Sequence, residues 1–156
     1  MRRRDFIKLL SGAAAWSQVA HAQGVSAPVI GYLSSALRDP TTYVASAFRQ
    51  GLNESGFVEG RDLAIEYRFA EGHYDRCAEL AADLVRRRVS VIVATGSTAP
   101  AVAAKAATAD IPIVFVSGGD PVAAGLVASL NRPGSNVTGI TVIFSKLVPK
   151  RLELLH

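Results

Sequence analysis

The 156-residue sequence has little of the chemistry on which most catalytic and metal sites depend. It contains one cysteine, Cys77, so no disulfide can form within the chain. Its three histidines, His21, His73 and His156, lie far apart and accompany no second thiol, which leaves no spacing typical of a zinc site. We therefore expect neither a bound metal nor another cofactor.

Phosphate-binding loops and hydrolase motifs are also absent. The segment after the first apolar run reads GYLSSALRD instead of a Gly-x-Gly-x-x-Gly turn, and no Gly-x-x-x-x-Gly-Lys-Ser/Thr loop occurs. There is no Gly-x-Ser-x-Gly elbow, and the acidic residues form no evident pair for acid–base work. These absences predict a protein without catalysis.

Acidic residues are scarce in residues 1–22, which hold four of the 17 basic residues and one of the 13 acidic residues. A cationic start, a short apolar run and the small residues around His21 follow the order of a secretory signal peptide, and we predict cleavage after Ala22. Arg3-Arg4-Asp5-Phe6-Ile7-Lys8 resembles the twin-arginine export motif. The general secretory route and an amphipathic first helix of the folded protein are the alternatives.

Without that segment the chain has 13 basic and 12 acidic residues, a formal charge of +1. A near-neutral body argues against a nucleic-acid partner. The predicted signal peptide implies that the mature chain works in the periplasm. The basic run Arg86-Arg87-Arg88 follows a predicted helix, where interaction with the helix dipole explains it better than a nucleic-acid face does. The apolar stretch Leu9–Ala22 is shorter than the roughly 20 residues that a membrane-spanning helix needs.

From Pro28 onward, apolar runs alternate with segments of helical period, and glycine, proline, aspartate or asparagine stands at most junctions. This pattern predicts an α/β fold, an open parallel sheet of about five strands with helices on both faces. The expected strands are 29–35, 62–72, 89–96, 111–119 and 136–143, and the expected helices cover 42–56, 74–88, 97–110 and 120–130. Runs 89–96 and 111–119 are continuously apolar, which is typical of strands buried on both faces. Cys77 lies on an apolar helix face, so we assign it to the core.

Small polar residues follow three of these strands. Parallel strands end at one edge of a sheet, where loops and helix amino termini can hold a small anion such as a carboxylate. Turn and cap formation is the simpler role for any single one of these residues. The predicted ligand-binding residues are Ser34, Ser35, Gly96, Ser97, Thr98, Ser117, Gly118 and Asp120.

The block DPVAAGLVASLNRPGSNVTGI, residues 120–140, is similar to the most recognisable segment of the ABC transporter substrate-binding proteins related to tryptophan- and other amino-acid-binding lipoproteins. The segments IGYLSS, FRQGLNESGFVEGRDLAIEYRFAEG, AADLVRRRVSVIVATGS and KRLELLH also resemble that family. The resemblance implies two α/β lobes of the periplasmic binding protein type I kind, with a small-molecule solute held between them. Members are about twice as long as this chain.

By that resemblance, residues 23–144 form a first lobe and residues 145–156 a helix crossing toward a second lobe. The implied solute is an amino acid or an aromatic or organic carboxylate. The implied partner is an ABC permease in the inner membrane, reached through the export machinery. Asp120 either caps its helix, which the following proline favours, or pairs with a solute ammonium group. A periplasmic ligand-sensing module, or a small α/β enzyme that uses the same edge, is the alternative function.

Overall fold

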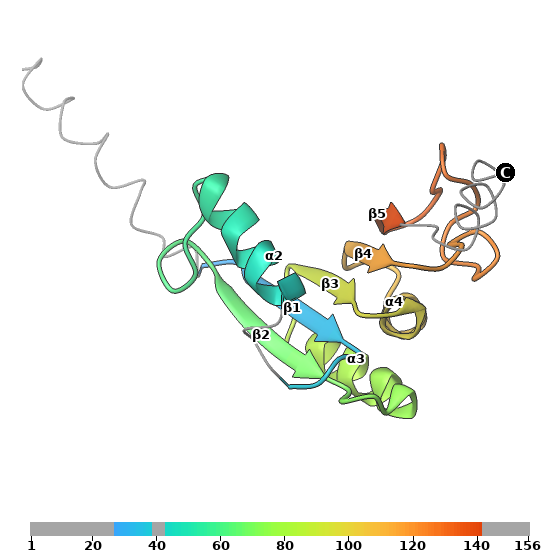
Figure 1. Ribbon diagram of the computed structural model, residues 1–156, viewed down its shortest axis with the longest axis horizontal. Coiled ribbons are helices and arrows are strands. Elements are labelled where there is room, and N and C mark those ends of the chain that lie inside the picture. Colours follow the sequence, from blue (N-terminus) through green and yellow to red (C-terminus); the bar gives the residue numbers. More distant parts are fainter. Residues whose placement is uncertain (1–26, 39–42, 142–156) are drawn as a thin grey trace, which may run out of the picture.

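The computed structural model describes residues 27–38 and 43–141 and contains a five-stranded sheet in the order β2-β1-β3-β4-β5 (Figure 1). Every neighbouring pair of strands is parallel, which confirms the predicted fold class. The expectations for residues 1–22 and 145–156 lie outside the described residues. The strands are β1 (Val29–Ser34), β2 (Ala64–Phe69), β3 (Val91–Thr95), β4 (Ile113–Ser117) and β5 (Val137–Thr141).

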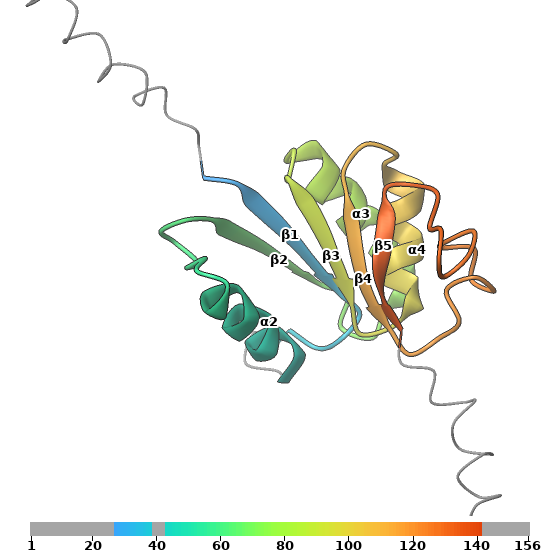
Figure 2. The same ribbon diagram turned by 90° about the horizontal axis from the view of Figure 1, so that it is seen from above.

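Helices cover both faces of this sheet (Figure 2). Helix α2 (Tyr43–Glu54) lies on one face, while α3 (Cys77–Arg86) and α4 (Thr98–Ala107) lie on the other. A short 3₁₀ helix, η1 (Tyr74–Arg76), leads into α3. No helix in the described part of the chain is long and apolar enough to cross a membrane.

The apolar core lies in two parts because side chains alternate between the two faces of each strand. Leu33, Ile92 and Ile113 pack beneath α3 and α4, while Tyr32 and Val93 pack beneath α2. The predicted core position of Cys77 is confirmed, since this residue is 1% exposed.

The predicted helix over residues 120–130 does not form. A single turn starts at Asp120 and ends at Gly125, which has a φ of +68°. The N–H of Leu126 donates to the Pro121 carbonyl (2.8 Å), and the N–H of Gly125 donates to the Val122 carbonyl (2.9 Å). These two bonds form a Schellman motif, which terminates a helix at a left-handed glycine. The glycine therefore stops the helix after one turn.

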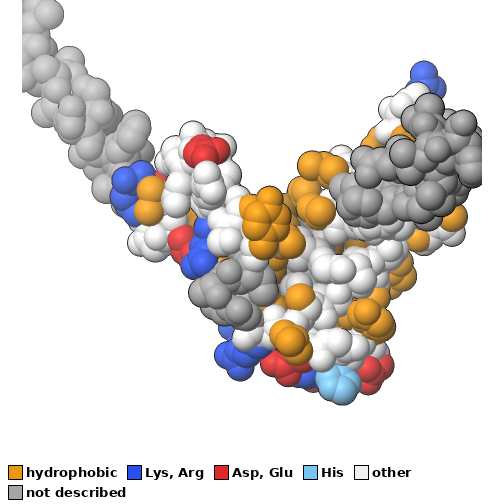
Figure 3. Space-filling model, in the orientation of Figure 1, with side chains coloured by type: hydrophobic (Ala, Val, Ile, Leu, Met, Phe, Trp, Pro, Cys, Tyr) orange, Lys and Arg blue, Asp and Glu red, His pale blue; other side chains and the backbone are white. Residues whose placement is uncertain are grey.

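Part of the sheet face that carries α2 is left open. Val93 pairs with Val114 across β3 and β4, and two residues further along β4, on the same face, Val116 pairs with Ile140 of β5. Val116 is 38% exposed and Ile140 is 65% exposed. Figure 3 shows a hollow between α2 and the β4–β5 side of the sheet, with hydrophobic side chains on its walls. The expected burial of the β4 run on both faces is therefore wrong at Val116 within the described structure.

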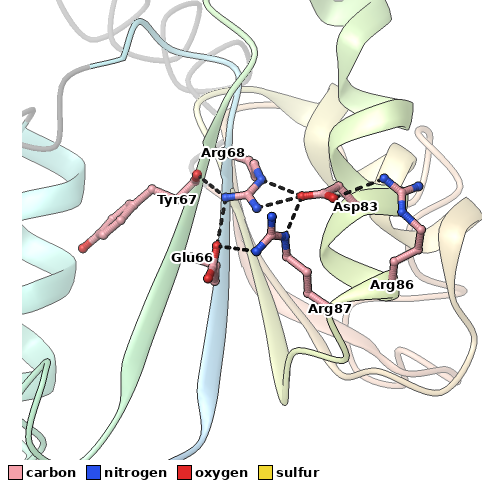
Figure 4. Close-up of polar contacts among 6 residues, drawn as sticks. All are labelled: Glu66, Tyr67, Arg68, Asp83, Arg86 and Arg87. Carbon is pink, nitrogen blue, oxygen red and sulfur yellow. Dashed lines mark hydrogen bonds and ion pairs between the residues drawn. The ribbon is translucent and has the colours of Figure 1, made fainter.

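Two residues of the basic run at the end of α3, Arg86 and Arg87, belong to an ion-pair network with the edge strand β2 (Figure 4). Asp83 accepts hydrogen bonds from Arg68 (2.7 Å), Arg86 (3.1 Å) and Arg87 (3.0 Å). The Arg68 hydrogen bonds are the largest cause that lowers the pKa of Asp83 to about 2. Arg86 and Arg87 thus have ion-pair partners within the fold, and their expected interaction with the helix dipole stays a prediction.

Candidate functional site

The loops after β1 and β3 meet at the carboxyl edge of the sheet, because these two strands are neighbours and parallel. The N–H of Ser35 donates to the Thr95 carbonyl at 3.2 Å. Gly96 has a φ of +89°, and a Cβ atom added there would lie 2.6 Å from Ser35 Oγ and 3.2 Å from Ser34 Oγ. The first loop therefore packs directly against the backbone of Gly96.

The loops after β3 and β4 are joined through side-chain hydroxyls. Thr98 Oγ1 and Ser117 Oγ are 2.9 Å apart and share a hydrogen bond, and Ser117 Oγ accepts from the N–H of Gly119 at 3.1 Å. Thr141, at the end of β5, donates through Oγ1 to the Gly119 carbonyl. We call the connected loop residues Ser34, Ser35, Gly96, Ser97, Thr98, Ser117, Gly118, Gly119 and Asp120 the rim.

The amino terminus of α4 belongs to the rim. Ser97 is its N-cap, and Ser97 Oγ accepts from the N–H of Ala99 at 3.3 Å. The first turn of α4 itself contains no acidic residue that would offset the positive end of the helix dipole. This end of the helix therefore favours an anionic group.

The predicted rim residues divide into buried supports and accessible groups. Ser34, Ser35 and Ser117 are 2%, 6% and 4% exposed, and Ser34 Oγ accepts from the N–H of Ala36 at 3.2 Å. These three buried serines support the loops from inside the fold. Gly96 and Gly118 are exposed, and Ser97, Thr98 and Asp120 are partly exposed, so this second group can contact a solute.

Asp120 acts as a cap, one of the two roles left open by the sequence. Its Oδ1 atom accepts from the N–H groups of Val122 (3.0 Å) and Ala123 (3.2 Å). What it caps is the single turn that ends at Gly125. Its charge nevertheless lies at the same edge of the sheet as the positive end of α4, so the rim offers both signs of charge.

Sequence reasoning missed two contributors to the rim. Thr141 holds the Gly119 carbonyl, as described above, and Tyr32 lies beneath the rim, where its hydroxyl accepts from Thr95 Oγ1 at 3.0 Å. Burial raises the pKa of Tyr32. Thr141 ends its strand as Ser117 does, so its position was a usable signal, whereas the Tyr32 contact spans 63 residues and leaves no local signal.

No group of three or more His, Cys, Asp or Glu side chains that could hold a metal ion occurs within residues 27–38 and 43–141. The rim instead offers hydroxyls, backbone N–H groups and a helix amino terminus. Such groups bind and orient a small polar molecule through hydrogen bonds.

Known proteins are similar to this chain in sequence and in fold. The chain is 37% identical over 107 residues to a tyrosine-binding protein of Clostridioides difficile, an alignment that covers 69% of this chain and 30% of that protein. A Streptococcus pneumoniae ABC domain solved in complex with L-Trp is 28% identical, with a TM-score of 0.67 over 74% of this chain and 39% of that one. A conserved domain protein from Vibrio cholerae is 32% identical, with a TM-score of 0.70 over 83% of this chain and 43% of that one.

The chain thus spans less than half the length of each of these relatives. The family model for ABC transporter substrate binding proteins matches residues 33–156, which includes every described element from the end of β1 onward. The chain therefore belongs to the ABC transporter substrate binding protein family.

Proposed function

We propose that the chain is the solute-binding component of an ABC importer and holds an amino acid at the rim without catalysing a reaction. The observation that carries this proposal is the junction of three loops at one sheet edge, with accessible Ser97 and Thr98 at the amino terminus of α4. Hydroxyls and open N–H groups beside a helix amino terminus suit a carboxylate.

The charges at the rim fit a zwitterion. A solute carboxylate would lie at Gly96, Ser97 and Thr98, where the helix dipole is positive. Its ammonium group would lie toward the negative charge of Asp120. An aromatic amino acid is the first candidate, because the names of two relatives report tyrosine binding and an L-Trp complex. Other aromatic or organic carboxylates share the carboxylate but lack the second charge.

We also propose that the chain is exported. Residues 1–22 would act as a signal peptide of the twin-arginine kind, and the mature protein would work in the periplasm with an inner-membrane permease. Residues 23–144 would form one lobe, and residues 145–156 would lead toward a second lobe. Family membership supports the solute and the permease as partners.

Calorimetric titration with matched ligands tests the solute and its orientation. L-tryptophan, tryptamine, which lacks the carboxylate, and indolepropionate, which lacks the ammonium group, share one ring system. We expect L-tryptophan to bind best and tryptamine to lose at least about tenfold in affinity, because a charged hydrogen bond contributes about 1.5–3 kcal/mol. Equal affinities for L-tryptophan and tryptamine, or binding of neither L-tryptophan nor L-tyrosine, would count against the proposal.

Two variants test whether L-tryptophan binds at the rim or elsewhere on the surface. Thr98→Val removes the hydroxyl that faces Ser117 but keeps the side-chain shape, so we expect weaker L-tryptophan binding. Thr138→Val makes the same change on β5, where the residue is exposed and away from the rim loops. Affinity should fall only for Thr98→Val.

A further inference from the structure

A polar hollow of about 300 Å³ lies at the outer edge of β2, apart from the rim residues. Among the described residues, its lining includes three arginines, Arg38, Arg68 and Arg76, and one acidic residue, Glu71. Positive charge therefore outweighs negative charge among the described residues that line this hollow. The space can hold several water molecules, each of which takes about 30 Å³.

The three arginines are neutralised to different degrees. Arg68 is held by Asp83 at 2.7 Å and by Glu66 at 3.1 Å, as Figure 4 shows. Arg76 pairs with Glu71 at the longer distance of 3.5 Å. Within residues 27–38 and 43–141, Arg38 has no ion-pair partner. Among these three arginines the unpaired positive charge is therefore that of Arg38, while Arg76 is held by a single carboxylate.

The backbone of β2 adds a donor to the same hollow. The N–H groups of Ala64 and Ala70 donate to β1 and its leading residue, at Pro28 (3.0 Å) and Ser34 (2.8 Å). Because N–H directions alternate along a strand, the N–H of Phe69 faces the free edge. The Tyr67 carbonyl on that edge already accepts from Arg68 Nη1 at 2.8 Å. The Tyr67 carbonyl is therefore already paired, and the N–H of Phe69 is a donor on this edge.

We propose that this hollow is a second binding site, which takes the carboxylate or phosphate group of a small molecule between Arg38, Arg76 and the N–H of Phe69. Guanidinium groups bind planar or tetrahedral oxyanions through paired N–H donors. Arg38 and Arg76 are exposed, so binding is weak and decreases as salt increases. The proposal does not depend on solute binding at the rim.

Amide and guanidinium signals of the ¹⁵N-labelled full chain test this site. One titration uses sodium phosphate, a second uses sodium succinate, and sodium chloride at equal ionic strength is the reference. We expect saturable shifts of the Phe69 amide and the Arg38 Nε–H signal. Saturation by both anions supports a general oxyanion site, and saturation by one alone identifies the group that is bound.

Arg38→Ala should weaken this binding by about threefold to fivefold, a size typical of an exposed charge pair. Arg88→Ala is the matched control. This substitution removes the same charge, and Arg88 is an exposed residue just after the carboxyl end of α3. Circular dichroism of both variants checks that they fold. Shifts that match sodium chloride, or equal losses in Arg38→Ala and Arg88→Ala, would overturn the proposal.

Discussion

Replacing Gly96 with alanine is the sharpest perturbation of the rim. Gly96 has a φ of +89°, where an L-residue costs about 1–2 kcal/mol. The new Cβ would also lie 2.6 Å from Ser35 Oγ and 3.2 Å from the Ser35 nitrogen, and overpacking of this kind costs about 1–3 kcal/mol. We therefore expect Gly96→Ala to lower the free energy of unfolding by about 2–5 kcal/mol.

Gly56 provides a control with nearly the same backbone. Its φ is +88°, and no atom lies within 4 Å of an added Cβ, so Gly56→Ala carries the backbone cost alone. Urea unfolding of both variants separates the two contributions, and Ser35→Ala in the Gly96→Ala background should recover part of the loss by removing the clashing oxygen. If Gly96→Ala costs no more than Gly56→Ala, the first loop does not pack against Gly96 as described.

Three other predictions concern the rest of the described chain. Arg88 has a φ of +56° directly after α3, so Arg88→Gly should raise the free energy of unfolding by about 1 kcal/mol in urea titrations; a loss would refute this. The pKa of Asp83 is about 2, below its ordinary 3.8, so its stabilising effect is full above about pH 4 and is lost as the pH falls toward about 2. Asp83→Asn should therefore lower the free energy of unfolding at neutral pH, and its difference from wild type should disappear as the pH falls from about 4 to about 2. A difference that does not change with pH would contradict this prediction. Cys77 is 1% exposed and burial raises its pKa, so a thiol reagent should react with the native chain at least about a thousandfold more slowly than with the unfolded chain, and comparable rates would place Cys77 outside the core.

The sequence was sufficient to predict the sheet and the position of the rim. Short apolar runs separated by turn residues indicate parallel strands, and the strand-end rule then places the residues after β1, β3 and β4 together. The fourth helix was predicted wrongly. Residues 120–130 have a helical pattern, and the pattern does not show that Gly125 ends the helix. Its left-handed φ, which ends the helix, is set by the Schellman bonds around it.

Contacts between distant residues were beyond sequence reasoning. The bond between Thr98 and Ser117, which makes Ser117 a support rather than an exposed donor, joins two loops. Arg68 and Asp83 are 15 residues apart and face each other only because α3 crosses behind β2. Exposure of Ile140 depends on what lies over the sheet, which the alternating pattern of β5 does not encode.

The proposed function depends on binding of an amino-acid solute at the rim. Amide chemical-shift mapping of the ¹⁵N-labelled chain during titration with L-tryptophan tests this most directly. We expect saturable shifts concentrated at residues 96–99 and 118–120, at the carboxyl edge of the sheet. Saturable shifts confined to other surfaces, or no saturable shift up to the solubility limit of L-tryptophan, would contradict it.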